Sequence, residues 1–183
     1  MRNKLPLQAL MEAAIFASLA FLLDLLPSIK LSPVISISFA MVPIFYVALR
    51  WGVKAGMASG FLWGLLQVIL GDAYILTPVQ AFIEYFVAFA FIGMAGVFAG
   101  KLAKAEKKAP VILAAVFIGS AARYVWHFLA GWIYFGEYAP EGTPAALYSL
   151  FVNGITMLGA FALCSIVMMF LWKAAPRLLT VRA

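Results

Sequence analysis

Three ionisable side chains stand inside stretches of sequence that are otherwise apolar. Glu84 lies within residues 78–99, and Arg123 and His127 lie within residues 110–135. Arg123 and His127 are four residues apart, so they project from one face if this stretch is helical. An ionised group at the centre of a bilayer costs about 2.5–3.5 kcal/mol on insertion scales, so such groups face the protein interior and usually mark a site. The three residues therefore predict a polar site in an apolar setting.

Other residues able to bind a ligand accompany these three. Gly131 continues the face of Arg123 and His127 and leaves room for a flat group. The polar and aromatic side chains of the neighbouring stretches are Trp63, Gln67, Gln80, Tyr85, Tyr148 and Asn153. A carboxylate, an imidazole, an amide and several aromatic rings together are typical of a pocket for a flat, polar, cationic ligand.

Each of these residues also has an ordinary structural interpretation. Glu84 and Arg123 could form a structural ion pair, and His127 could be a packing residue. Tyr148 could belong to the belt of aromatic residues at a membrane interface. A scaffold whose buried polar groups only fix helix packing would explain the same residues. An intramembrane enzyme with Glu84 and His127 as acid and base is a further alternative.

No sequence motif of a known enzyme class accompanies the polar residues. The chain lacks a His-Glu-x-x-His zinc pattern, a Gly-x-Ser-x-Gly elbow and a phosphate-binding loop. Its single cysteine, Cys164, allows no internal disulfide and no cysteine-based metal site. We therefore expect no catalysis, no cofactor and no metal. Without a nucleotide site, active transport would need an ion gradient or a partner.

The elements that must position these residues are membrane helices. Of the 183 residues, 66% are hydrophobic and 11% are charged, against roughly 45–50% and about 25% in soluble domains. A spanning helix needs about 20 mostly apolar residues. The sequence predicts one all-α domain over residues 1–183, with six transmembrane helices. Their expected bounds are about 7–26, 34–50, 53–71, 78–99, 110–135 and 145–173.

Basic residues are concentrated on alternate connections between the predicted spans. Those on the termini, the 50–54 turn and the 100–109 loop are Arg2, Lys4, Arg50, Lys54, Lys101, Lys104, Lys107, Lys108, Lys173, Arg177 and Arg182. The charged residues of the three opposite connections are the base Lys30 and the acids Asp24, Asp72, Glu137 and Glu141. The positive-inside rule therefore predicts that both termini are cytoplasmic, which agrees with an even number of crossings.

Glycine and proline residues indicate where helices approach closely or break. Four glycines spaced four residues apart, from Gly52 to Gly64, line one face of the third span. They would let a neighbouring backbone approach closely and bring Trp63 near a shared cavity. Pro43 lies inside the second span, where it either kinks the span or marks a short, broken segment.

Five segments carry a resemblance to a known family of membrane proteins. They are Phe61-Leu-Trp-Gly64, Ala73-Tyr-Ile-Leu76, Gln80-Ala-Phe-Ile-Glu-Tyr85, His127-Phe-Leu-Ala-Gly131 and Tyr148-Ser-Leu-Phe-Val-Asn-Gly154. In order and spacing, over nearly the whole chain, they resemble the thiamine-specific S component of energy-coupling factor (ECF) transporters. The resemblance implies a six-helix protein of the prokaryotic cell membrane that captures thiamine from outside. It also implies two kinds of partner, a membrane-embedded coupling subunit and two cytoplasmic ATPases.

The same resemblance implies roles for individual residues. The polar centre of the thiamine pocket would be Glu84, His127, Tyr148 and Asn153, and its further lining would be Tyr85, Trp63, Arg123 and Gly131. Glu84 can accept a hydrogen bond from the aminopyrimidine and offset the thiazolium charge. The amide and phenol groups can read the pyrimidine edge, and the imidazole can stack or hydrogen-bond.

Three positions depart from the family pattern. The first outer loop reads Ser28-Ile-Lys-Leu-Ser-Pro-Val34, without the tryptophan expected there. Phe135 takes the position of a stacking residue that is usually tryptophan, and Arg123 replaces a lysine. An S component for another vitamin, or for a precursor such as hydroxymethylpyrimidine, is the alternative within transport.

The first predicted helix carries a candidate docking face for the coupling subunit. The family docks through a small-x-x-x-small pattern, which matches Ala14 and Ser18 here. Ala13 and Ala17 offer the same spacing one residue earlier. Small residues allow close helix contact in lipid, and packing within the chain itself is the alternative use.

Overall fold

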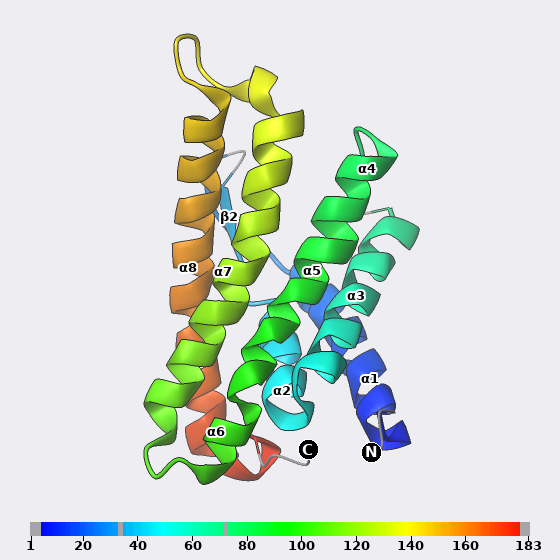
Figure 1. Ribbon diagram of the computed structural model, residues 1–183, viewed down its shortest axis with the longest axis vertical. Helices are drawn as coiled ribbons and strands as arrows, with labels where there is room; N and C mark the ends of the chain where they lie inside the picture. The colour runs from blue at the N-terminus through cyan, green and yellow to red at the C-terminus, as the bar shows by residue number, and fades with distance from the viewer. Residues whose placement is uncertain (1–4, 33–34, 72, 180–183) are drawn as a thin grey trace.

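A computed structural model of the chain describes residues 5–32, 35–71 and 73–179. In these residues six main helices are joined by a short two-stranded hairpin that lies beside the C-terminal helix (Figure 1). The helices are α1 (Leu7–Asp24), α2 (Val42–Trp51), α3 (Val53–Ile69), a continuous helix Pro78–Lys104, α7 (Lys108–Tyr134) and α8 (Ala145–Ala174). Short 3-10 turns, η3 (Gly136–Tyr138) and η4 (Pro176–Leu179), follow α7 and α8.

The helix Pro78–Lys104 changes its winding along its length. Its segments are α4 (Pro78–Ala81), the π-helical turn η1 (Phe82–Val87), α5 (Ala88–Phe91), the 3-10 segment η2 (Ile92–Phe98) and α6 (Ala99–Lys104). Pro78 is tolerated because it occupies the first turn, and Thr77 caps that turn by accepting a hydrogen bond from the Gln80 N–H at 3.1 Å.

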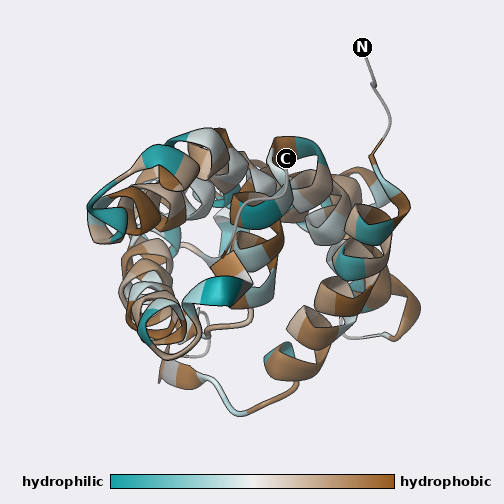
Figure 2. Cartoon of the chain, turned by 90° about the horizontal axis from the view of Figure 1, so that it is seen from below, coloured by the Kyte–Doolittle hydropathy of each residue, from teal (hydrophilic) through white to brown (hydrophobic). Residues whose placement is uncertain are grey.

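Most of the predicted spans are confirmed as helices. Four helices, α1, Pro78–Lys104, α7 and α8, are long and apolar enough to cross a membrane, and α3 is a shorter apolar helix of 17 residues. Large apolar side chains are exposed on these helices, which are mostly hydrophobic in Figure 2, and lipid would cover them. Four charged residues of the topology prediction lie outside the described residues, namely Arg2, Lys4, Asp72 and Arg182.

The predicted second span, 34–50, is wrong over its first part. Val34 lies outside the described residues, and the chain then forms a strand, β2 (Ile35–Ile37). This strand pairs antiparallel with β1 (Ile29–Ser32), with Ile29 opposite Ile37. The reason is visible in the sequence, because isoleucine and serine alternate from Ile35 to Ser38 with the two-residue period of a strand.

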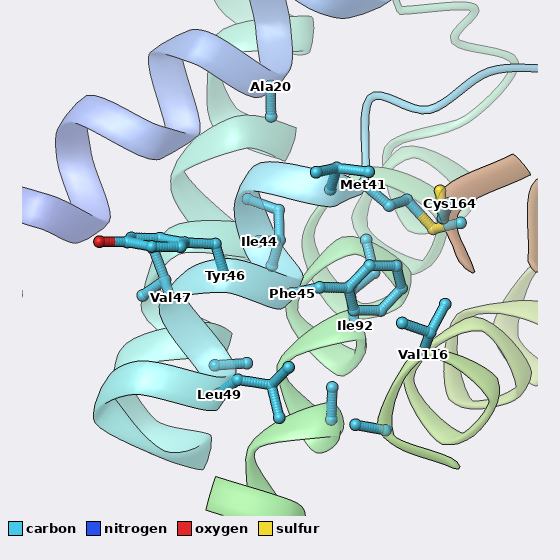
Figure 3. Packing of buried hydrophobic residues seen from close by; sticks show 14 of the residues in the cluster. Ala20, Met41, Ile44, Phe45, Tyr46, Val47, Leu49, Ile92, Val116 and Cys164 are labelled. Atoms are coloured by element: carbon cyan, nitrogen blue, oxygen red, sulfur yellow. The ribbon is translucent and has the colours of Figure 1, made fainter. Parts of the chain in front are cut away.

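Helix α2 begins only at Val42 and is a short segment of ten residues. Pro43 falls in its first turn, where a missing N–H costs no hydrogen bond, so this proline marks a short segment and not a kink. All ten residues of α2 are buried. Figure 3 shows Phe45 pointing toward Ile92 and Val116, so α2 forms the centre of the apolar core.

Three of the four glycines, those within α3, allow the close backbone approach that the sequence predicts. A Cβ atom added at Gly56, Gly60 or Gly64 would come within 3 Å of the backbone of the helix Pro78–Lys104. The two helices are therefore in direct backbone contact. Gly52 serves a different purpose, because it takes φ 85° at the turn between α2 and α3, a conformation that favours glycine.

The two ends of the described helical bundle lie on the same side. The start of α1 and the end of α8 are both at the lower end in Figure 1, and the α7–α8 connection is at the upper end. The hairpin lies against α8, where Ile37 of β2 packs against Gly159, while Ile29 and Leu31 of β1 are exposed. Non-helical backbone at membrane depth is stable only when protein or a cavity surrounds it.

Candidate ligand-binding site

Three adjoining chambers surround His127, which lines all of them. The outer chamber, which reaches Tyr148, has a volume of about 420 Å³. The hairpin chamber, which reaches Ser36 of β2, has about 300 Å³, and the α3 chamber, which reaches Gln67 of α3, has about 240 Å³. Glu84 lines the outer and α3 chambers, and Asn153 lines the outer and hairpin chambers. The three therefore belong to one polar site between α3, the helix Pro78–Lys104, α7 and α8, and the end of α1 and the hairpin also border it.

The outer chamber brings together six of the residues that the sequence predicts. They are Glu84, His127, Gly131, Phe135, Tyr148 and Asn153. Its other lining residues are Tyr74, Tyr138, Ser149 and Val152. The chamber is thus lined by a carboxylate, an imidazole, an amide and four aromatic rings. Such a lining is expected for a ligand that is both flat and polar.

Glu84 is held by its own helix. It lies in the π-helical turn Phe82–Val87, a type of turn that is common at functional sites. The side-chain amide of Gln80 donates to Glu84 Oε2 and also to the Tyr74 carbonyl at 3.2 Å. Gln80 Oε1 accepts from the Leu76 N–H at 3.0 Å. Gln80 is fully buried, so it fixes both the carboxylate and the loop that carries Tyr74.

His127 connects Glu84 to Arg123. Its Nδ1 lies 3.4 Å from Glu84 Oε1, and Arg123 Nε donates to its Nε2 at 3.0 Å. A ring that accepts at Nε2 and donates from Nδ1 is a neutral imidazole. The suggested ion pair between Glu84 and Arg123 is therefore wrong for the described structure, in which the carboxylate pairs with His127 instead.

Arg123 rests on aromatic rings. Its guanidinium lies 4.3 Å from the centroid of the Phe89 ring and 5.3 Å from that of Trp63. Trp63 is only 1% exposed and meets Phe89 edge-on, so the structure places it beneath Arg123 and not on a chamber wall. Tyr85 lines the α3 chamber and accepts a hydrogen bond from the Tyr74 N–H at 2.7 Å.

Gly131 sets the distance between α7 and α8. A Cβ atom at this position would collide with Ser149 Oγ, which donates to the Phe128 carbonyl at 2.8 Å. The Asn153 amide in turn donates to the Ser149 carbonyl at 3.1 Å. The glycine therefore allows both Ser149 and Asn153 to sit against α7.

Several site residues are absent from the sequence prediction. Tyr74 and Tyr138 meet at the mouth of the outer chamber, with their hydroxyl oxygens 3.3 Å apart. Tyr74 belongs to the segment Ala73–Leu76, which resembles the thiamine-specific S component, but nothing in the sequence predicts that it contacts Tyr138. The position of Tyr138 in the chain indicates only an aromatic residue at the membrane interface. Asp24 lines the hairpin and α3 chambers, although the sequence indicates it only as a topology signal.

Two buried polar atoms on the chamber walls have no protein partner in the described structure. They are Gln67 Oε1 in the α3 chamber and Ser120 Oγ in the hairpin chamber. Buried polar groups are rarely left without a hydrogen bond. Their position is consistent with chambers that receive polar groups.

Comparison with known proteins shows which proteins share this sequence and fold. Residues 10–180 match the family described as "Thiamine transporter protein (Thia_YuaJ)". The chain belongs to the thiamine transporter family.

Individual relatives of this family are similar over almost the full length. The thiamine transporter ThiT of Bacillus subtilis (strain 168) is 42% identical, over 98% of this chain and 97% of that protein. The ThiT of Lacticaseibacillus paracasei is 33% identical, over 97% and 93%. A solved structure of ThiT from Listeria monocytogenes aligns with a TM-score of 0.90 at 38% identity, over 94% of this chain and 97% of that one.

Membership of the thiamine transporter family decides between the broad alternatives. The chain is a multi-pass protein of a bacterial plasma membrane that functions in transport and not in catalysis. The intramembrane enzyme and the purely structural scaffold are therefore set aside.

Proposed function

We propose that this chain binds thiamine in the outer chamber and is the substrate-binding subunit of an ECF-type importer. The observation that carries the proposal is the convergence of Glu84, His127, Tyr148 and Asn153 on one chamber of about 420 Å³. These residues come from the helix Pro78–Lys104, α7 and α8, and they supply one negative charge, hydrogen-bonding groups of both kinds and aromatic surface.

The chemistry of thiamine matches these groups. Its aminopyrimidine needs both donors and acceptors, which the carboxylate, imidazole, amide and phenol supply. Its thiazolium carries a fixed positive charge, which Glu84 offsets and aromatic faces attract. Tyr74, Phe135 and Tyr138 form a row of rings with centroids 6.2 Å and 6.0 Å apart. We propose that this row takes the stacking role of the tryptophans that the family pattern leads one to expect.

The transport cycle in this proposal needs partners. The sequence has no nucleotide-binding motif, so energy would come from two cytoplasmic ATPases through a membrane-embedded coupling subunit. The whole chain would act as one unit, with the lower end of Figure 1 and both termini in the cytoplasm. The outer chamber, at the opposite end, would then receive thiamine from outside.

Calorimetric titration of the purified chain in detergent tests the ligand assignment. We expect one thiamine per chain, bound without ATP, and far weaker binding of riboflavin, biotin and hydroxymethylpyrimidine. Absence of thiamine binding at micromolar concentration would contradict the proposal. Tighter binding of hydroxymethylpyrimidine than of thiamine would assign the chain to the precursor instead.

A further inference from the structure

A second carboxylate, Asp24, lies beside the site at the last residue of α1. It lines both the hairpin chamber and the α3 chamber. Ser38 Oγ donates to its Oδ1 at 3.4 Å and Gln67 Nε2 donates to its Oδ2 at 2.5 Å. A negative charge at the C-terminal end of a helix opposes the helix dipole, so the stability of α1 does not explain this aspartate.

Arg123 presents an electrostatic problem for a site that binds a cation. It lines the same two chambers as Asp24, and its guanidinium is permanently charged. Two like charges about 8 Å apart, at an effective dielectric constant of about 20, repel enough to weaken binding about thirtyfold. A cationic ligand beside His127 would experience this repulsion unless a nearby negative charge offsets Arg123.

We propose that Asp24 is a specificity-determining residue that offsets the charge of Arg123 and so reserves the charge of Glu84 for a cationic ligand. Among the described residues lining the three chambers, the charged groups are Asp24, Glu84 and Arg123, since His127 is neutral. Their sum is one negative charge, which matches one fixed positive charge on the ligand. The inference rests on the proposed thiamine-binding function, and it assigns Asp24 no contact with the ligand.

Binding of a charged and an uncharged ligand separates this role from a structural one. The probes are thiamine and an analogue whose thiazolium is replaced by an uncharged ring. Asp24→Asn should weaken thiamine binding about ten- to hundredfold, and should change binding of the uncharged analogue less than about threefold. Glu106→Gln removes the same charge from the exposed loop at the opposite end, and should change neither.

A second substitution tests the balance with Arg123 directly. In Asp24→Asn/Arg123→Met the site regains one net negative charge, so thiamine should bind more tightly than to Asp24→Asn alone. Equal weakening of both ligands in Asp24→Asn, with no gain in the double variant, would overturn the inference and leave Asp24 a structural residue. If Asp24→Asn does not fold, Arg123→Met alone should raise the affinity ratio of thiamine to the uncharged analogue, and an unchanged ratio would overturn the inference.

Titration of the wild-type chain with thiamine distinguishes failure of the proposed function from failure of the Asp24 inference. A wild-type chain that binds no thiamine overturns the proposed function and this inference together. A wild-type chain that binds thiamine, with an Asp24→Asn variant of equal affinity and preference, overturns the inference alone.

Discussion

Glu84 and His127 orient each other in the described structure. Arg123 donates to one ring nitrogen of His127, so the other carries its proton toward Glu84. Gln80 fixes the second oxygen of the carboxylate. The Glu84 carboxylate is therefore fixed by neutral hydrogen-bond donors. In the proposed function, a cationic ligand that enters the outer chamber would meet a carboxylate that is already oriented.

Neutralising this charge should weaken thiamine binding selectively. Glu84→Gln keeps the shape but replaces one acceptor oxygen by a donor, which would face the donors of Gln80 or His127. We expect a loss of about 2–5 kcal/mol, or about thirtyfold to several thousandfold in affinity. Calorimetry measures this, with the exposed Glu141→Gln as the matched control. Wild-type affinity in a well-folded Glu84→Gln protein would remove Glu84 from the site.

Thiamine binding should also depend on the absence of a side chain at Gly131. Gly131→Ala places a methyl group against Ser149 Oγ and should push α8 away from the outer chamber. We expect thiamine affinity to fall at least about tenfold, a loss of about 1.4 kcal/mol. Gly154→Ala is the control on α8, because a Cβ atom there meets nothing within 4 Å. Equal affinities of the two variants would show that the α7–α8 spacing does not matter for binding.

At the scale of the elements, the irregular helix Pro78–Lys104 is shaped by its contact with α3. Glycines on α3 admit the carbonyl groups of Tyr85 and Phe89, and the winding changes from π to α to 3-10 along the same stretch. The π-helical turn that carries Glu84 therefore lies directly on the α3 backbone. The position of the Glu84 carboxylate therefore depends on direct backbone contact between α3 and the helix Pro78–Lys104.

One added methyl group in this contact should destabilise the protein. Gly64→Ala would overlap the Tyr85 carbonyl, and overpacking of this kind costs about 1–3 kcal/mol or more. We expect a lower melting temperature and weaker thiamine binding, since Glu84 neighbours the displaced residue. Gly100→Ala, on α6, meets nothing within 4 Å and should be neutral or slightly stabilising. An unchanged melting temperature in Gly64→Ala would contradict direct backbone contact.

At the scale of the whole molecule, α1 has two faces with different neighbours. Ala9, Ala13, Ala17 and Ala20 are buried, and Ser59 Oγ of α3 donates to the Ala13 carbonyl at 2.8 Å. Ala14 and Ser18 are exposed, on a different face of the helix. The inner alanines let α3 approach, and in the proposed function the exposed pair would contact the coupling subunit.

A steric block on the outer face should separate binding from uptake. Ala14→Leu/Ser18→Leu should abolish thiamine uptake in cells that supply the coupling subunit and ATPases, while the purified variant keeps wild-type affinity. Ala162→Leu changes another exposed alanine, on α8, and is the control that should support normal uptake. Parallel loss of binding and uptake in the α1 variant would show that these residues pack internally.

The sequence by itself determines the kinds of element and the chemical groups of the site. Length and apolarity predict membrane helices because a bilayer accepts little else, and an ionisable residue in such a helix must face inward. Glu84, His127, Tyr148 and Asn153 could be named on that basis together with the family resemblance. The glycine spacing on α3 likewise predicts a close helix contact, which the structure confirms.

Tertiary structure decides which surfaces meet. Helical periodicity fixes the angle between Ala13 and Ala14, but only the position of α3 shows which of the two is buried. The strand Ile35–Ile37 replaces the first part of a predicted helix because it pairs with β1 and packs on α8. Asp24 and Arg123 line one chamber although about 99 residues separate them, and the hydroxyl groups of Tyr74 and Tyr138 meet across 64 residues. The proximity of residues so far apart in the sequence depends on how whole helices pack, and no local sequence pattern predicts it.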